Sequence, residues 1–339
     1  MGDSTTRNRS INVLKGISCF SVILLHASFP GILGKILYGF ARFAVPFFFM
    51  VSGYFSYNSN YEDLKNKLPN KIKHIFAYFV FAEIIYLIWH VFDNYFLGGK
   101  EAVLQWVNEV FTLTNFVKLL IFQTAVIGDV SWFMIALILC YVSVFFIGKH
   151  DKWDIMFIIS LILLVINVIV GEALPFLGCK IQWYFNSNFL LLGCPFFYIG
   201  ASVKRRMPKF DDKNLITMLL FGMGLVLVER VFTSASQFFA GTFFMTYSIF
   251  IYAVHYPNGL KCGWVEKVGE NYTFGIYILH PIVRDICDYF LKQNVIYYWA
   301  RPILIFLISL LIFDLFTKSK STLYKLTYCA ISNKTFKNL

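Results

Sequence analysis

The chain has 339 residues, of which 58% are hydrophobic, 19% aromatic and only 14% charged, and its mean hydropathy is +0.65. A soluble domain carries about 25% charged residues, so this composition excludes a soluble protein and predicts an integral protein of the lipid bilayer. The formal net charge of +11 indicates basic cytoplasmic loops in a multi-pass protein, and no nucleic-acid partner is predicted.

Apolar runs of helical length follow one another along the chain, and each predicts a membrane-spanning helix. In chain order they lie at 11–29, 36–55, 72–97, 131–148, 153–171, 187–203, 214–229, 238–255, 272–291 and 298–317. A weaker segment at 113–127 predicts an interfacial helix. The predicted fold is an all-α bundle of about ten transmembrane helices.

Around this bundle we predict a cytoplasmic tail at 1–10, a single membrane domain at 11–317 and a basic cytoplasmic tail at 318–339. With the N-terminus inside the cell, most of the 30 Lys and Arg residues fall on cytoplasmic segments. This asymmetry favours an even number of spans and both termini in the cytoplasm. The predicted location is the cytoplasmic membrane.

The first span carries two ionisable residues on one face. Eleven helical steps separate Lys15 from His26, which places them within about 20° of the same face and about 16 Å apart. Cys19 and Val22 lie on the same stripe. Ionisable groups inside a membrane usually face a cavity or the bundle interior. The alternative is that Lys15 extends to the cytoplasmic interface and His26 is an ordinary interfacial histidine.

Two further residues near the outer surface need an explanation. Arg42 lies one or two turns inside the span 36–55, where its charge must be paired or hydrated. Trp132 opens the span 131–148, and it is either a functional residue or a member of the interfacial aromatic belt.

Polar stripes also occur in two later spans. Tyr277, His280, Arg284 and Asp288 share one face of 272–291, although Arg284 and Asp288 are also spaced to pair with each other at i,i+4. The span 72–97 has a similar face, made of Glu83, Tyr86, His90 and Asp93. The seven cysteines show no metal-ligand spacing, so no metal site is predicted.

Several segments together resemble the acyltransferase 3 family of multi-pass membrane acyltransferases. The first is Lys15-x10-His26, and the second runs from Arg42 to Tyr54 with the core VPFFFMVSGY. SWFM at 131–134 and YILHP at 277–281 are similar to later landmarks of that family, in the expected order. Many members have Arg where this chain has Lys15, and Lys lacks the bidentate geometry of Arg.

The resemblance implies an O-acyltransferase that moves an acyl group, commonly acetyl, from cytoplasmic acyl-CoA to a hydroxyl of an extracytoplasmic glycan or cell-envelope polymer. His26 would be the catalytic residue, either as general base or as transient carrier of the acyl group. It also implies catalytic roles for Lys15, Arg42, Trp132 and His280. Lys15 would in addition bind the donor near the cytoplasmic mouth of the bundle.

Binding residues for the two substrates follow from position. Lys204, Arg205 and Arg206 are candidates for the phosphates of acyl-CoA, although cytoplasmic topology explains the same charges. For the acceptor we predict a contribution from the outer ends of two spans and from aromatic residues in the outer loops. The candidates are Arg284, Asp288, Glu83 and His90, together with Tyr95, Trp106, Trp183 and Tyr184. Anchoring at the membrane interface explains the four aromatic residues at least as well.

A transporter or exporter of an envelope glycan or lipid-linked precursor is the alternative function. Ionisable groups inside the membrane serve proton or substrate pathways equally well. The Lys15-x10-His26 spacing separates the two hypotheses, because transport does not require it.

Overall fold

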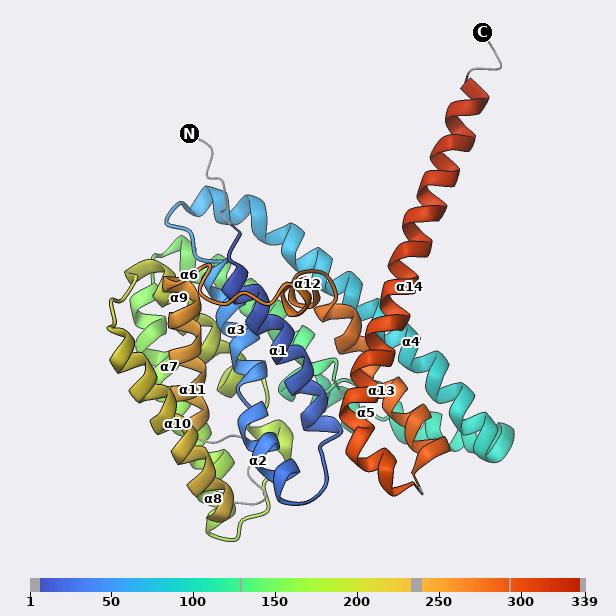
Figure 1. The fold of residues 1–339 in the computed structure, drawn as a ribbon, viewed down its shortest axis with the longest axis horizontal. Coiled ribbons are helices and arrows are strands. Elements are labelled where there is room, and N and C mark those ends of the chain that lie inside the picture. Colours follow the sequence, from blue (N-terminus) through green and yellow to red (C-terminus); the bar gives the residue numbers. More distant parts are fainter. Residues whose placement is uncertain (1–6, 129, 233–239, 293, 336–339) are drawn as a thin grey trace.

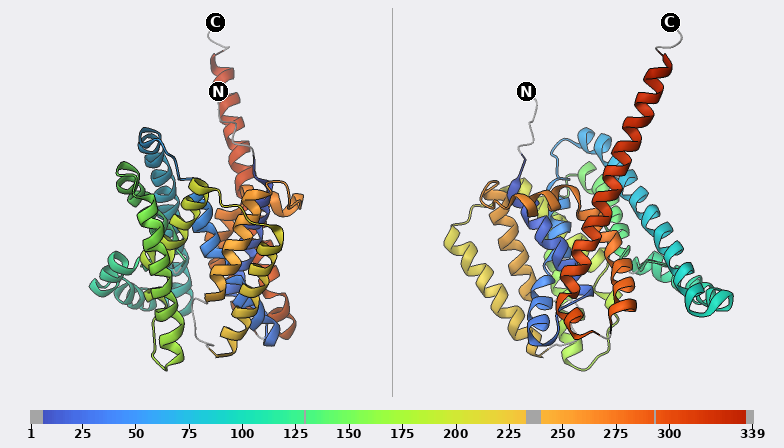
Figure 2. Two further views of the ribbon diagram at one scale, coloured as in Figure 1. Left: turned by 90° about the vertical axis from the view of Figure 1, so that its left-hand side faces the viewer. Right: turned by 45° about the vertical axis from the view of Figure 1, so that its right-hand side comes forward.

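A computed structural model describes residues 7–128, 130–232, 240–292 and 294–335, with side chains as far as residue 318. Over these residues the chain is helical and forms no strand. Figures 1 and 2 show a bundle of helices, with α4 and α5 projecting to one side and α14 extending beyond it. The elements are α1 (Arg9–His26), α2 (Gly31–Ala41), α3 (Ala44–Tyr54), α4 (Tyr61–Val110), α5 (Leu113–Phe122), α6 (Trp132–Lys149), α7 (Trp153–Val168), η1 (Ile169–Ala173), α8 (Leu174–Phe176), η2 (Trp183–Phe185), η3 (Phe189–Gly193), α9 (Cys194–Arg206), α10 (Asp212–Phe232), α11 (Ala240–His255), α12 (Gly263–Asn271), α13 (Thr273–Leu291) and α14 (Val295–Thr335).

The all-helical membrane architecture is confirmed, whereas the number of spans stays a prediction. Every predicted apolar run overlaps helical backbone. Within the described residues, 6 helical segments are long and apolar enough to cross a membrane, namely Gly31–Tyr54, Tyr61–Val110, Trp132–Lys149, Trp153–Phe176, Asp212–Phe232 and Val295–Lys318. The start of α1 and the end of α14 lie at the same end of the bundle (Figure 1), but the side of the membrane on which they lie stays a prediction.

The predicted single helix at 36–55 is two helices. The break falls at Arg42, whose N–H bonds the carbonyl of Gly39 three residues back rather than four. Pro46 follows four residues after Arg42 and has no N–H to donate to the Arg42 carbonyl. The helix therefore ends and restarts as α3, and the break places the side chain of Arg42 at a bend between two helices.

Two other predicted elements also differ in detail. The run 187–203 begins with the π-helical turn η3, so its α-helix α9 starts only at Cys194. The helix α12, which the apolar pattern does not predict, precedes α13. On α12, Glu266 is buried and binds Arg7 and Arg9 of the chain start at 2.8 and 3.0 Å.

Close backbone contact at glycines holds the central helices together. A Cβ added at Gly53 of α3 would lie 1.8 Å from the carbonyl oxygen of Phe197 on α9, and one at Gly269 of α12 would lie 1.8 Å from the carbonyl of Asn12 on α1. Gly16 makes the reciprocal approach from α1 to α12. Small residues at such crossings are typical of membrane helices, where lipid removes the hydrophobic drive and packing must supply the attraction.

The contact between α3 and α9 gives a stability prediction. Gly53→Ala forces the two helices apart, and we expect it to cost about 1–3 kcal/mol of stability, as other overpacked sites do. Thermal unfolding of the purified protein in detergent measures this. Gly224→Ala is the matched control, because a Cβ there meets nothing within 4 Å and alanine favours the helix. Equal melting temperatures for the two variants would contradict the prediction.

Candidate active site

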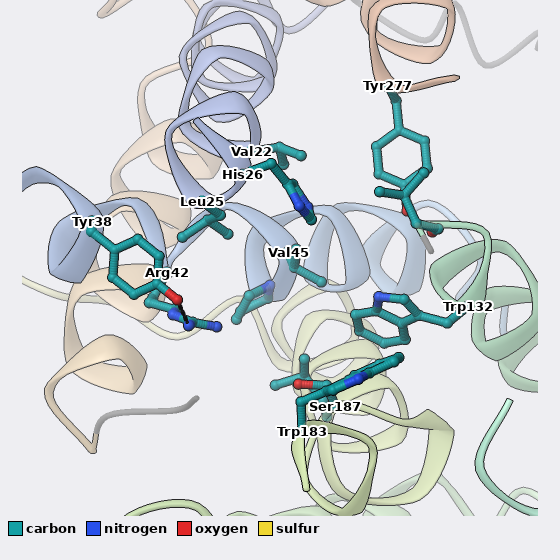
Figure 3. A pocket seen from close by; sticks show the side chains of 13 residues that line it. Val22, Leu25, His26, Tyr38, Arg42, Val45, Trp132, Trp183, Ser187 and Tyr277 are labelled. Carbon is teal, nitrogen blue, oxygen red and sulfur yellow. Dashed lines mark hydrogen bonds between the residues drawn. The ribbon is translucent and has the colours of Figure 1, made fainter. Parts of the chain in front are cut away.

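A cavity of about 350 Å³ opens between α1, the α2–α3 bend, the start of α6 and the segment around η2. This volume lies in the range of about 300–1,000 Å³ typical of small-molecule sites. Figure 3 shows His26 between the Tyr38–Arg42 pair on one side and the indoles of Trp132 and Trp183 on the other. We call it the outer cavity, and it is lined by Val22, Leu25, His26, Tyr38, Arg42, Val45, Pro46, Val130, Trp132, Trp183, Ser187, Leu192 and Tyr277.

A second cavity of about 180 Å³ adjoins the first along α1, and we call it the inner cavity. Val22 and Tyr277 line both cavities. The remaining walls of the inner cavity are Lys15, Cys19, Phe48, Ser52, Phe133, Leu137, Thr273 and Phe274. The stripe predicted on the first span therefore faces this interior path along its whole length, from Lys15 at one end to His26 at the other.

His26 is the last residue of α1, and its side chain is exposed to the outer cavity. Its ring centroid lies 5.2 Å from that of His280 on α13, with the ring planes 49° apart. The guanidinium of Arg42 lines the same cavity as His26. Two histidines and one cation from distant parts of the sequence thus lie near the end of α1.

His280 is fully buried behind His26. Its Nδ1 lies 3.2 Å from the carbonyl oxygen of Ile276. A carbonyl can only accept, so Nδ1 carries the proton and Nε2 holds a lone pair. Within the described part of the chain, Nε2 is buried and has no hydrogen-bond partner. A buried acceptor without a partner is costly, so packing alone does not explain the presence of this ring.

Arg42 lines the outer cavity and is held by Tyr38, one helical turn earlier on α2. Its guanidinium donates to the Tyr38 hydroxyl and its Cζ lies 4.6 Å from the centre of the Tyr38 ring. On the other side of the site, the ring centroids of Trp132 and Trp183 lie 6.4 Å apart. These contacts hold Arg42 as a charged wall on one side of the outer cavity and the two indoles as an aromatic wall on the other.

Buried amides hold the segment 183–193, which carries the aromatic wall. Asn167 on α7 donates to the carbonyl of Leu191 at 2.6 Å, and Gln123 at the end of α5 accepts from the N–H of Phe189 at 2.9 Å. Both side chains are buried. Because this segment is largely irregular, such side chains replace the backbone partners that a regular helix would supply.

The structure brings together the predicted residues His26, Arg42, Trp132, His280 and, in the inner cavity, Lys15. Other candidates lie elsewhere. In the described part of the chain, Lys204, Arg205 and Arg206 line neither cavity. Arg205 and Arg206 bind Asp154 at 3.2 and 2.7 Å, and the Lys204 ammonium lies over the ring of Tyr54. Their role toward CoA phosphates stays a prediction.

The predicted acceptor residues on α4 and α13 also lie outside the two cavities. Arg284 forms an ion pair with Asp285 at 2.7 Å, and Asp288 forms one with Arg301 of α14, so the i,i+4 pair considered from the sequence is not made. The ring of His90 stacks on that of Trp106. Glu83 lies on the same helix α4 as His90.

Sequence reasoning missed Tyr38, Ser187 and Ser52 as cavity residues. The position of Tyr38 four residues before Arg42 was a usable signal, since i,i+4 side chains meet on a helix. Ser187 gave no such signal, because it lies in an irregular segment without periodicity. Among the described residues, no group of three or more His, Cys, Asp or Glu side chains is placed to hold a metal ion.

Residues 8–318 match the family model described as "Acyltransferase domain", that of acyltransferase 3. The chain belongs to the acyltransferase 3 family. This confirms the resemblance carried by Lys15-x10-His26 and the later landmarks, and it identifies the protein as a membrane acyltransferase. A search of curated proteins and a search of solved structures found no match.

The outer cavity of this acyltransferase gives an accessibility prediction. We expect Val45→Cys, which lines the cavity, to react with a small water-soluble methanethiosulfonate. The neighbouring variant Ala44→Cys is the control and should stay unlabelled, because Ala44 is fully buried. The exposed Cys179 and Cys262 are first replaced by Ser, and labelling is followed by mass spectrometry. Equal labelling at the two positions would contradict the described cavity.

Proposed function

We propose that this protein is an O-acetyltransferase of the cytoplasmic membrane, which moves an acetyl group from cytoplasmic acetyl-CoA to a hydroxyl of an extracytoplasmic glycan or cell-envelope polymer. The observation that carries the proposal is the continuous stripe of α1. Along it, Lys15 lines the inner cavity, His26 lines the outer cavity, and Val22 lies where the two adjoin. A donor and an acceptor that enter from opposite ends of this path meet near His26.

The donor end of the path is the inner cavity. Its walls are mostly apolar, with Ser52, Thr273 and the Lys15 ammonium as polar groups. This suits a pantetheine arm, which is a flexible chain with two amides, and Lys15 lies where negative charge of the CoA would approach. The thioester at the end of the arm then reaches Val22 and Tyr277, one to two turns from His26.

The acceptor end is the outer cavity. The indoles of Trp132 and Trp183 offer apolar faces against which a sugar ring packs, and an indole N–H can donate to a hydroxyl. Trp183 was predicted as an acceptor contact from the outer loops, and its place beside Trp132 supports that role. The remaining predicted acceptor residues, on α4 and α13, lie outside the cavity. They would contact an acceptor that is large enough to extend out of it.

In the proposed reaction, His26 acts as general base toward the acceptor hydroxyl. The imidazole takes the hydroxyl proton while the oxygen attacks the thioester carbonyl carbon. A C–O bond forms, the C–S bond breaks, and the CoA thiolate leaves with the proton returned by the imidazolium. Negative charge develops on the carbonyl oxygen, and the guanidinium of Arg42 at the cavity wall stabilises it.

His280 is the positioning residue for His26. The proton on its Nδ1 is fixed by the Ile276 carbonyl, so its Nε2 accepts the N–H of His26 when the two rings close from their 5.2 Å centroid separation. That contact selects one tautomer of His26 and leaves its other nitrogen unprotonated toward the acceptor. The buried Nε2 then gains the partner that it otherwise lacks.

The reaction gives a direct prediction for His26. With radiolabelled acetyl-CoA and protein in membranes or detergent, we expect His26→Ala to lower CoA release and label transfer by at least about 100-fold, the contribution typical of a general base. His150→Ala removes an exposed histidine outside both cavities and should keep wild-type rates.

A wild-type protein that neither binds nor turns over acetyl-CoA, combined with a His26→Ala variant that keeps the cellular phenotype, would exclude the acyltransferase reaction and favour the exporter.

A second prediction separates positioning by His280 from a structural role. We expect His280→Leu to lower kcat about tenfold with little change in the KM for acetyl-CoA, because one hydrogen bond to the base is lost. His280→Gln supplies an amide oxygen near the same place and should recover part of kcat. If both variants lose activity in proportion to folded protein on size-exclusion chromatography, the role is structural instead.

A further inference from the structure

We propose that Phe133 limits the length of the acyl group that this enzyme transfers, by closing the junction of the two cavities so that acetyl fits there and butyryl does not. This inference rests on the proposed function and specifies its donor. It starts from the two residues that line both cavities, Val22 on α1 and Tyr277 on α13. In the proposed reaction the thioester lies between them when the acceptor attacks. The side chains around them are therefore the walls of the acyl site.

Tyr277 forms one wall of the junction and is held at its far end. Its hydroxyl donates to the backbone carbonyl of Val130, which lies just before α6. Its ring centroid is 6.0 Å from that of His280 and 5.7 Å from that of Phe133. A longer acyl chain therefore cannot displace this ring without breaking the hydrogen bond or moving the neighbouring rings.

Phe133 forms the adjacent wall, on the side of the inner cavity. Its ring lines that cavity together with the ring of Phe48 on α3, and the two ring centroids are 6.3 Å apart. Phe133 also packs against Phe49 at a centroid distance of 4.7 Å, and Phe49 is fully buried. Close-packed interiors contain little free volume, so Phe133 cannot retreat without disturbing the core.

The geometry of acyl transfer makes this wall a limit on chain length. A nucleophile attacks a carbonyl carbon from outside the plane that holds the oxygen, the sulfur and the first carbon of the acyl chain. In the proposed reaction the acceptor approaches from the outer cavity, so this plane lies across the path and the acyl chain points to a wall of the junction.

Little room is left in that direction. The pantetheine arm occupies the inner cavity behind the thioester, and Val22 on the opposite wall is itself buried. A methyl group is small enough for this space, whereas each further methylene presses on the rings of Phe133 and Tyr277. Overpacking of this kind is unfavourable, because the rings must leave their preferred positions.

A series of acyl-CoA donors tests this. Acetyl-, propionyl-, butyryl- and hexanoyl-CoA differ only in chain length, and CoA release is followed in permeabilised cells of the source organism, where the natural acceptor is present. The rate in cells that carry His26→Ala is subtracted, so that only turnover at this site is counted. Between acetyl and butyryl, kcat/KM of the wild type should fall at least about tenfold, because one methylene in an apolar pocket changes discrimination by about 10- to 200-fold.

Variants then locate the limit. Phe133→Ala should raise the butyryl-to-acetyl ratio of kcat/KM at least about tenfold, because the missing ring leaves room for the longer chain. Phe133→Leu removes less volume, and it should accept butyryl while still discriminating against hexanoyl. Phe146→Ala is the matched control, because it removes the same ring from an exposed position of the same helix outside both cavities. Its ratio should equal that of the wild type. A ratio between two donors does not depend on the amount of folded enzyme, so partial misfolding does not change it.

Three results would overturn the inference. One is a wild type that turns over butyryl-CoA as well as acetyl-CoA. Another is a ratio for Phe133→Ala no different from that of wild type or of Phe146→Ala. The third is complete loss of turnover with every donor in both Phe133 variants, which would make the role of this ring structural. In each case, release of CoA from acetyl-CoA that depends on His26 leaves the proposed function intact. Absence of that release with every donor in the wild type would refute the reaction and the inference together.

Discussion

Close packing between helices at glycines is the constraint on which the rest of the structure depends. In a membrane, apolar surface gains nothing by leaving lipid for another helix, so the bundle must be held by short contacts between backbones. Gly16 and Gly269 bring α1 onto α12, and Gly53 and Gly200 bring α3 onto α9. These crossings fix α1 and α3, which line both cavities together with α6 and α13. The site exists because larger residues are absent where the helices cross.

In a well-packed bundle, burying a polar side chain costs free energy, and this cost explains where the polar side chains lie. His280 is buried with an Nε2 that finds no partner among the described residues, yet it stands 5.2 Å from the ring of His26. Arg42 lies at a bend that Pro46 forces between α2 and α3, where the side chain reaches a cavity instead of lipid. His280 and Arg42 thus both lie beside the two cavities along α1, and packing explains neither position.

The sequence was sufficient for the periodic part of this arrangement and not for the rest. Lys15, Cys19, Val22 and His26 follow from helical spacing alone, because one regular helix carries all four. The proximity of His26 and His280 could be predicted only through the family resemblance, because the two residues are 254 positions apart in the sequence. The wall at Ser187 depends on π-helical and irregular backbone held by Asn167 and Gln123, for which no pattern in sequence exists. Ion pairs such as Asp288 with Arg301 depend on helix packing that spacing within one helix does not determine.

Charge along the path suggests why one cavity system can serve two substrates. Lys15 lines the inner cavity and Arg42 the outer cavity, while Val22 and Tyr277 at the junction carry no charge. In the proposed reaction, the donor brings phosphates to the inner end and the acceptor presents a hydroxyl at the outer end. The group that crosses the junction, acetyl, is neutral and small. In that reaction, Lys15 would hold the donor at the inner end by attraction, and the uncharged junction would let only the transferred group pass, because desolvating an anion there would cost far more than desolvating an ester.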